Sequence, residues 1–147
     1  MSKVTVLGAG AWGSTMAQVL SDAGNHVLMW GRNQEIVDEI NTTHTNRKYL
    51  DENVLPLGIS ATTDLKQAFE YSNIYVLAVP AQVLRENLKS WKSLVDPAAT
   101  YISTLKGIEV STLSRMTEII HEEMNTESFA LITGPNLATE LIMRQPA

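Results

Sequence analysis

Short apolar runs alternate with helical patterns along the whole chain, and this alternation limits the possible folds more than any other feature. The apolar runs lie at residues 4–7, 26–30, 59–62, 73–79, 100–104 and 129–133. Between them, apolar residues recur three or four positions apart, which is typical of amphipathic helices. The runs are apolar almost throughout, so the strands are expected to be buried on both faces. The sequence therefore predicts an α/β fold: a doubly wound, mainly parallel sheet with helices on both faces.

The helical segments are expected at definite places. One face of the first helix, residues 12–23, is expected to pack on the sheet, and it carries Trp12, Met16, Val19, Leu20 and Ala23. Further helices are expected over residues 34–41, 64–70 and 111–124, after Pro80, and from Pro135 onward. The helix over 111–124 is expected to direct Leu113 inward. Residues 42–57 are expected to form an irregular, functional loop, because such a long connection is unusual in a compact domain.

The composition excludes several classes of protein. The chain has 147 residues, 44% of them hydrophobic, and a net charge of −5, which suits one domain with a core and excludes intrinsic disorder. Cysteine is absent, which excludes a disulfide scaffold, and the three histidines are scattered, so no metal site is expected. The acidic balance argues against nucleic-acid binding. Because no apolar run approaches the ~18 residues of a spanning helix, we expect a cytoplasmic protein without an integral membrane segment.

A glycine-rich motif follows the first expected strand. Residues 8–13 read Gly-Ala-Gly-Ala-Trp-Gly, a complete G-x-G-x-x-G pattern that opens a helix. In such a motif Gly8 allows the tight turn, Gly10 lets the backbone approach a pyrophosphate, and Gly13 lets the helix pack on the strand. The helix N-terminus adds free N–H groups. Inside a β-α-β unit, the motif predicts a Rossmann-type domain that binds NAD or NADP; the alternative is a turn without a ligand. For Trp12 the alternative is a place in the core.

An arginine follows the second strand, where NAD-specific domains usually carry an acidic residue. Glu35 and Asp38 come later, within the expected helix. The guanidinium of Arg32 can instead pair with a 2′-phosphate, which favours NADP. The alternative is a solvated arginine in a loop.

Residues after the later strands are also candidates, because parallel sheets bind ligands beyond the carboxyl ends of their strands. Lys106 can neutralise a phosphate there or polarise a carbonyl; the alternative is a surface lysine. After the last strand, Gly134, Pro135 and Asn136 begin the expected final helix. Asn136 can bind a substrate oxygen, or it can merely cap that helix.

Taken in order, these segments resemble bacterial NAD(P)-dependent glycerol-3-phosphate dehydrogenases over essentially the whole chain. The matching segments are residues 8–13, 30–33, 46–50, 78–80, 106–109 and 134–140. Lys-Gly-Ile-Glu at 106–109 and Gly-Pro-Asn-Leu-Ala at 134–138 are far more specific than the glycine motif. The resemblance implies that NAD(P)H reduces dihydroxyacetone phosphate to sn-glycerol 3-phosphate, a precursor of phospholipids.

The resemblance also implies site residues. The implied cofactor contacts, besides the glycines, are Ala11, Trp12, Arg32, Asn33, Tyr49, Lys106 and Ala138. The implied substrate contacts are Lys106, Gly134 and Asn136. Many relatives have serine at position 11 and a second basic residue at position 33, so Asn33 weakens the case for a strict NADP preference.

Finally, the resemblance implies a second, helical substrate domain that carries the catalytic lysine, and possible dimerisation of the whole protein. Residues 1–147 are therefore interpreted as the NAD(P)-binding domain of a longer enzyme, without a catalytic proton donor of its own. Two alternatives stay open. One is the cofactor domain of a hydroxyacyl or hydroxyacid dehydrogenase, and the other is a non-catalytic dinucleotide-binding module.

Overall fold

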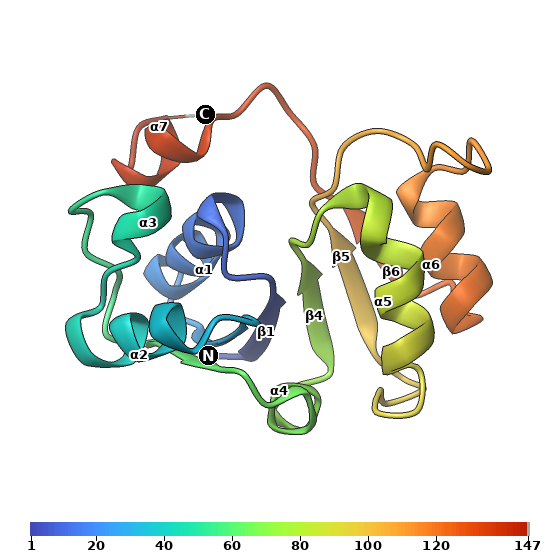
Figure 1. The fold of residues 1–147 in the computed structure, drawn as a ribbon, viewed down its shortest axis with the longest axis horizontal. Coiled ribbons are helices and arrows are strands. Elements are labelled where there is room, and N and C mark those ends of the chain that lie inside the picture. Colours follow the sequence, from blue (N-terminus) through green and yellow to red (C-terminus); the bar gives the residue numbers. More distant parts are fainter. Residues whose placement is uncertain (147) are drawn as a thin grey trace.

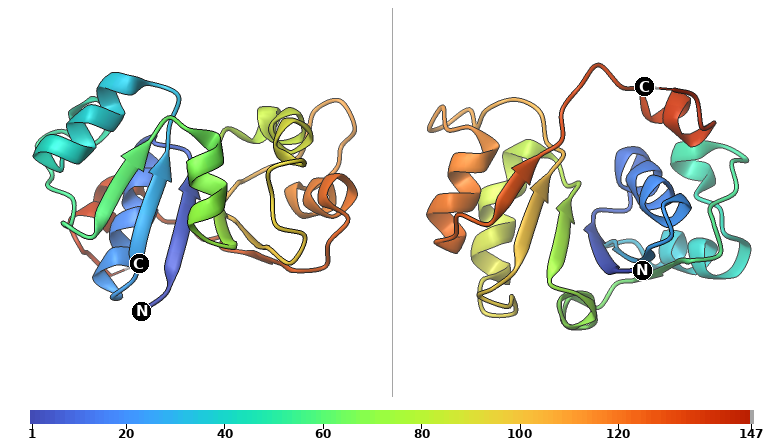
Figure 2. Two further views of the ribbon diagram at one scale, coloured as in Figure 1. Left: turned by 90° about the horizontal axis from the view of Figure 1, so that it is seen from below. Right: turned by 180° about the vertical axis from the view of Figure 1, so that it is seen from behind.

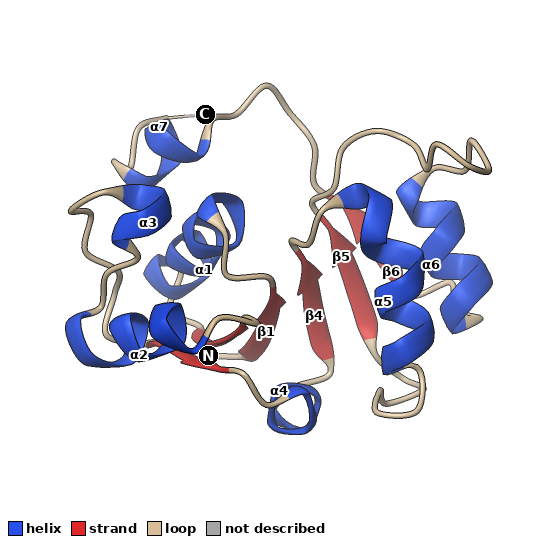
Figure 3. Cartoon of the chain, in the orientation of Figure 1, coloured by secondary structure: helices blue, strands red, loops and turns tan. Residues whose placement is uncertain are grey.

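Six parallel strands form one sheet in the order β3-β2-β1-β4-β5-β6 in the computed structural model, which describes residues 1–146. The strands are β1 (Lys3–Leu7), β2 (His26–Trp30), β3 (Ile59–Thr62), β4 (Ile74–Leu77), β5 (Thr100–Ser103) and β6 (Phe129–Leu131). Figure 3 shows them in red between the helices, and Figure 2 shows β6 beside β5. The predicted doubly wound α/β fold is confirmed.

Helices cover both faces of the sheet (Figure 1). One face carries α1 (Ala11–Asp22), α2 (Gln34–Thr43), α3 (Arg47–Leu50) and α7 (Ala138–Ile142). The other carries α4 (Leu65–Tyr71), α5 (Leu84–Trp91), which a short 3-10 turn η1 (Ala81–Val83) precedes, and α6 (Met116–Met124).

Each strand contributes side chains to both layers of the core. In β4, for example, Tyr75 and Leu77 pack with α4, α5 and α6, whereas Val76 packs with the helices of the opposite face. Alternate residues of a strand point to opposite faces, so a strand covered on both sides carries apolar residues at most of its positions. The continuous apolar runs in the sequence have this cause.

The face through which α1 packs on the sheet coincides only in part with the predicted one: Met16 is buried and Leu20 is partly buried against the core, as predicted. Val19 is 40% exposed and Ala23 is exposed. Small and polar residues are also buried: Gln18 Nε2 donates to the Ile142 carbonyl (3.1 Å) and Thr15 Oγ1 to the Ala11 carbonyl (2.9 Å), whereas the buried Gln18 Oε1 has no partner among the described residues. The prediction failed at Val19 and Ala23 because hydrophobic periodicity ignores small residues, which allow close packing. The buried positions are Gly13, Ser14, Thr15, Met16, Ala17 and Gln18.

The predicted starts of two helices, α6 and α7, were also wrong. Helix α6 begins at Met116, and Leu113 is 70% exposed with φ of 62°. The residues before it form a loop closed by its own bonds, since Leu113 N donates to the Glu109 carbonyl (2.8 Å). Helix α7 begins at Ala138 with Leu137 as N-cap, so neither Pro135 nor Asn136 opens it.

The connection over residues 42–57 is more ordered than predicted. It contains α3 and an isolated antiparallel bridge between Thr45 and Val54. Glu39 organises its start, because its Oε1 accepts hydrogen bonds from Arg47 N (2.9 Å) and Thr45 Oγ1 (2.7 Å). The Arg47 amide, followed by the Thr45 hydroxyl, lowers the pKa of Glu39 from its ordinary value of 4.5.

No helix within residues 1–146 combines the length and apolarity needed to cross a membrane. The same residues contain no group of three or more His, Cys, Asp or Glu side chains placed to hold a metal ion.

We predict that Glu39→Gln lowers Tm near neutral pH. A carboxylate with a depressed pKa in the folded state stabilises the fold above its unfolded pKa, and that contribution disappears as pH falls through the folded value. The Tm difference from the unsubstituted chain should therefore shrink as pH falls from 4.5. Thermal unfolding followed by circular dichroism tests this. Glu70→Gln, which removes only an exposed pair with Lys66 at 3.7 Å, is the control. A Tm difference that does not depend on pH would contradict the role of the carboxylate.

Candidate functional site

A cavity of about 570 Å³ opens beyond the carboxyl ends of the strands, where the strand order reverses between β1 and β4. Doubly wound sheets bind their ligands at this place. Eight residues singled out from the sequence line it together: Gly8, Gly10, Ala11, Trp12, Arg32, Asn33, Tyr49 and Lys106. Ala78, Val79, Pro80 and Ala81 also line the cavity, although sequence reasoning assigned a ligand contact to none of them.

The three glycines of the motif have different roles. Gly8 has φ of +132°, and a Cβ there would lie 2.4 Å from the Ala78 carbonyl oxygen. A Cβ on Gly13 would lie 2.0 Å from the Gly8 carbonyl oxygen. At Gly10, by contrast, a Cβ would meet no atom within 4 Å, although Gly10 lines the cavity. Gly8 and Gly13 thus permit close packing of helix and strand, whereas Gly10 leaves backbone bare towards the cavity.

The N-terminus of α1 is suited to an anion. Its N-cap, Gly10, provides no side-chain hydrogen bond, and the first turn contains no acidic residue. The positive end of the helix dipole is therefore not neutralised by the helix's own side chains. With the bare surface at Gly10, this end of α1 fits the pyrophosphate of a dinucleotide.

Arg32 and Asn33 lie at the end of β2 and differ in their bonding. Arg32 is exposed and has no hydrogen bond or ion pair to another residue among 1–146. The Asn33 side chain caps α2, since its Oδ1 accepts from Glu35 N (2.8 Å) and Ile36 N (3.4 Å). Arg32 thus has donors available for a ligand, whereas the side-chain oxygen of Asn33 already accepts hydrogen bonds from the first turn of α2. A cofactor contact by Asn33 stays a prediction.

Lys106 and Trp12 face each other at the cavity. Lys106 Nζ lies 5.6 Å from the centroid of the Trp12 ring and donates a hydrogen bond to the Gly134 carbonyl (2.8 Å). Trp12 lines the cavity rather than the core, and its buried Nε1 has no partner among the described residues. Lys106 is exposed, but these two contacts place its ammonium at the cavity.

The predicted residues of the last segment lie outside the cavity lining. Gly134 reaches the site through its bond to Lys106, and the Asn136 side chain packs beside Gly134. Ala138 is linked to α1 instead, since Thr15 Oγ1 donates to its carbonyl (3.4 Å). Their contacts with substrate or cofactor stay predictions.

Sequence reasoning gave no role to Asn46, which supports the glycine motif. Its side chain is fully buried, and Nδ2 donates to the Ala9 carbonyl (3.0 Å) and to Ser14 Oγ (2.8 Å). It therefore ties the long connection after α2 to the turn between β1 and α1. An asparagine in a polar loop carries no local signal for such a contact.

The sequence matches, over residues 3–147, the family model described as the N-terminus of NAD-dependent glycerol-3-phosphate dehydrogenase. The chain belongs to this family. It is 46% identical to a glycerol-3-phosphate dehydrogenase [NAD(P)+] of Corynebacterium urealyticum, of which it covers 45%, with all of its own length aligned. Against the enzyme of Thermobifida fusca the identity is 47% with the same coverage of both chains. The chain thus spans about 45% of the length of these relatives.

Solved structures agree with the family assignment. The glycerol-3-phosphate dehydrogenase of Coxiella burnetii superposes with a TM-score of 0.91 at 30% identity, over 99% of this chain and 44% of that one. The enzyme of Saccharomyces cerevisiae gives 0.87 at 33% identity, over 96% and 44%. A prephenate dehydrogenase at 16% identity, with a TM-score of 0.64, shares only the fold.

We predict that Gly10→Val weakens dinucleotide binding by more than about tenfold, or 1.4 kcal/mol, while the chain still folds. A side chain there fills the space next to the helix N-terminus but meets no protein atom. Valine is a poor N-cap, so a modest fall in Tm is expected. Titration with NADPH, followed by nicotinamide fluorescence, measures the affinity.

Gly13→Val is the matched comparison, because its Cβ would collide with the Gly8 carbonyl. That variant should lose the fold itself. If folded Gly10→Val binds NADPH as well as the unsubstituted chain does, the turn does not cradle the pyrophosphate.

Proposed function

We propose that residues 1–147 form the NAD(P)-binding domain of an enzyme that interconverts dihydroxyacetone phosphate and sn-glycerol 3-phosphate. The product would supply phospholipid synthesis. One observation carries the proposal: the uncapped N-terminus of α1, bare at Gly10, opens into the same cavity as Arg32 and Lys106. The chain's membership of the glycerol-3-phosphate dehydrogenase family names the substrate class.

The residues of this chain would bind and orient rather than transfer protons. The N-terminus of α1 and Gly10 hold the pyrophosphate, and Arg32 holds the adenosine end. Lys106 places a positive charge at the cavity, where substrate phosphate or a polarised carbonyl is stabilised. The nicotinamide cofactor, when bound, supplies the hydride. A helical second domain would contribute the proton donor and the remaining substrate contacts.

The proposal also covers the substrates, assembly and location of the whole protein. Dihydroxyacetone phosphate and sn-glycerol 3-phosphate are its expected small-molecule partners, and a homodimer is its expected assembly. The cytoplasm is its expected location, in keeping with a chain that has no cysteine. No observation favours a hydroxyacid dehydrogenase or a non-catalytic module, because the structures with other substrates match at only 16–19% identity.

We predict that Arg32→Ala weakens the binding of NADPH more than that of NADH. Arg32 has no protein partner within residues 1–146, and the first acidic residue after it, Glu35, lies inside α2. A charge-assisted bond to phosphate contributes about 1.5–3 kcal/mol, or about 10- to 150-fold in affinity. Parallel titrations with the two coenzymes measure the selectivity. Arg47→Ala, which removes an arginine paired with Glu52, is the control. Equal losses for NADPH and NADH would show that Arg32 does not read the 2′-phosphate.

We predict that residues 1–147 alone bind NADPH but do not turn over dihydroxyacetone phosphate. A positioned acid or base typically contributes 10²–10⁴-fold, and Lys106 is committed to the Gly134 carbonyl. The assay follows NADPH oxidation by the 147-residue chain and by a protein of the full family length. If the two rates agree within about tenfold, the proton donor lies within these residues and the two-domain proposal fails.

A further inference from the structure

The segment that carries Lys106 is anchored on its upstream side by β4. Thr104 precedes Lys106 by two residues, and both its amide N and its Oγ1 donate to the Leu77 carbonyl, at 3.2 and 2.7 Å. Gly107 follows Lys106 with φ of +96° and no atom within 4 Å of an added Cβ. The backbone is therefore held before Lys106, and the residue directly after it is a glycine with positive φ.

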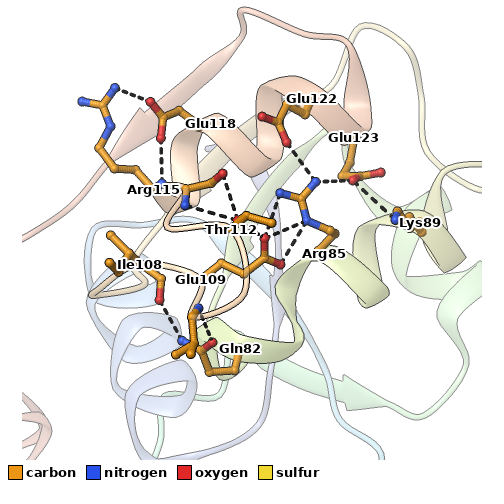
Figure 4. Close-up of polar contacts among 12 residues, drawn as sticks. Gln82, Arg85, Lys89, Ile108, Glu109, Thr112, Arg115, Glu118, Glu122 and Glu123 are labelled. Atoms are coloured by element: carbon orange, nitrogen blue, oxygen red, sulfur yellow. Dashed lines mark hydrogen bonds and ion pairs between the residues drawn. The ribbon is translucent and has the colours of Figure 1, made fainter.

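Gln82 holds the same segment on the downstream side of Gly107. Its Nε2 donates to the Ile108 carbonyl (2.8 Å), and its Oε1 accepts from Val110 N (3.0 Å), as Figure 4 shows for the first of these bonds. One side chain thus bonds two backbone groups flanking residue 109. Gln82 belongs to η1, next to Ala81 of the cavity wall, so the wall and the lysine segment are directly connected.

Arg85 completes the downstream anchor by pairing with Glu109. Only 7% of Glu109 is exposed, and Arg85 Nε lies 3.0 and 2.9 Å from its two carboxylate oxygens. Thr112 Oγ1 also donates to this carboxylate. Thr112, together with Arg85, lowers the pKa of Glu109. A nearly buried carboxylate with these partners stays ionised, and breaking the pair would leave an uncompensated charge.

The remaining bonds of Arg85 hold α6 rather than the lysine segment. Its Nη1 contacts Glu122 and Glu123 of α6, and Lys89 of α5 lies 3.8 Å from Glu123 (Figure 4). The cluster therefore has two separable arms. Glu123 joins α5 to α6, whereas Glu109 joins α5 to the segment after β5.

We propose that Gln82 and the Arg85–Glu109 pair are positioning residues for Lys106. They fix the backbone on the downstream side of Gly107, as Thr104 fixes it on the upstream side, and so hold the ammonium above the Trp12 ring at the Gly134 carbonyl. The inference rests on the proposed function in one respect: Lys106 is taken to contact cofactor and substrate, as proposed above. Within the Lys-Gly-Ile-Glu segment, Glu109 then positions the backbone, whereas Lys106 contacts the ligands.

The first test uses the free chain and no cofactor. In a protein with ¹³C-labelled lysine, the Lys106 side-chain signal is identified by its loss in Lys106→Met, and the Trp12 ring current should shift it upfield. In Glu109→Gln and in Gln82→Ala that signal should move towards the position of the exposed Lys66. Gln82→Ala keeps the Arg85–Glu109 pair intact and is therefore expected to fold. It provides the test if Glu109→Gln does not fold.

Glu123→Gln is the matched control, because it removes another carboxylate from Arg85 without touching the lysine segment. It should lower Tm but leave the Lys106 signal in place. An unshifted Lys106 signal in folded Gln82→Ala and Glu109→Gln would overturn the proposal, as would an equal displacement in Glu123→Gln.

The second test is a double-mutant cycle on the full-length enzyme. Glu109→Gln should reduce kcat/KM for dihydroxyacetone phosphate at least about fivefold. When Lys106→Met is already present, the same change should reduce kcat/KM by less than about twofold. The effects of independent sites add to within about twofold, so a larger difference between the two backgrounds shows coupling. Equal effects in both backgrounds would show that Glu109 does not act through Lys106. Failure of the unsubstituted chain to bind NAD(P)H would count against the proposed function alone, because the lysine signal is measured without cofactor.

Discussion

The close contact between α1 and β1 is the constraint on which the rest of the site depends. Gly13 lies against the Gly8 carbonyl, and Gly8 in turn lies against the backbone that follows β4. Any side chain at these two positions would force the helix away from the sheet. Because the contact is made, the N-terminus of α1 is directed at the point where the strand order reverses. The polarity of the helix and the topology of the sheet thus create the anion site together.

Two polar side chains, the buried Asn46 and the exposed Lys106, connect other segments around the cavity to one another and to this contact. Asn46 bonds the Ala9 carbonyl and Ser14 Oγ, which fastens the connection after α2 to the glycine turn. Lys106 bonds the Gly134 carbonyl, which fastens the segment after β6 to the segment after β5. A buried donor such as Asn46 Nδ2 is costly to leave unpaired, so its two bonds favour this one arrangement of the connection. The cavity is therefore largely formed before any ligand enters.

The sequence predicted most of the fold because its strands are covered on both faces and carry apolar residues at most positions. It also predicted which loops meet, since strand ends in a parallel sheet lie on one edge. It failed where packing depends on small or polar residues. The buried face of α1 carries Ser14 and Gln18, and no periodicity of hydrophobic residues reveals that face. Asn46 and Glu109 were missed as buried anchors because their partners are distant in sequence.

The central claim is that the cavity at the reversal of strand order is the dinucleotide site, and mapping NADPH binding by amide chemical shifts tests it most directly. The account predicts the largest shift changes at residues 10–13, 31–33 and 104–106, which line this cavity or border it. A second hollow of about 630 Å³, lined in part by Lys92, Tyr101 and Asn125, lies elsewhere and should be unaffected. Changes centred on that second hollow, or none at saturating NADPH, would contradict the account.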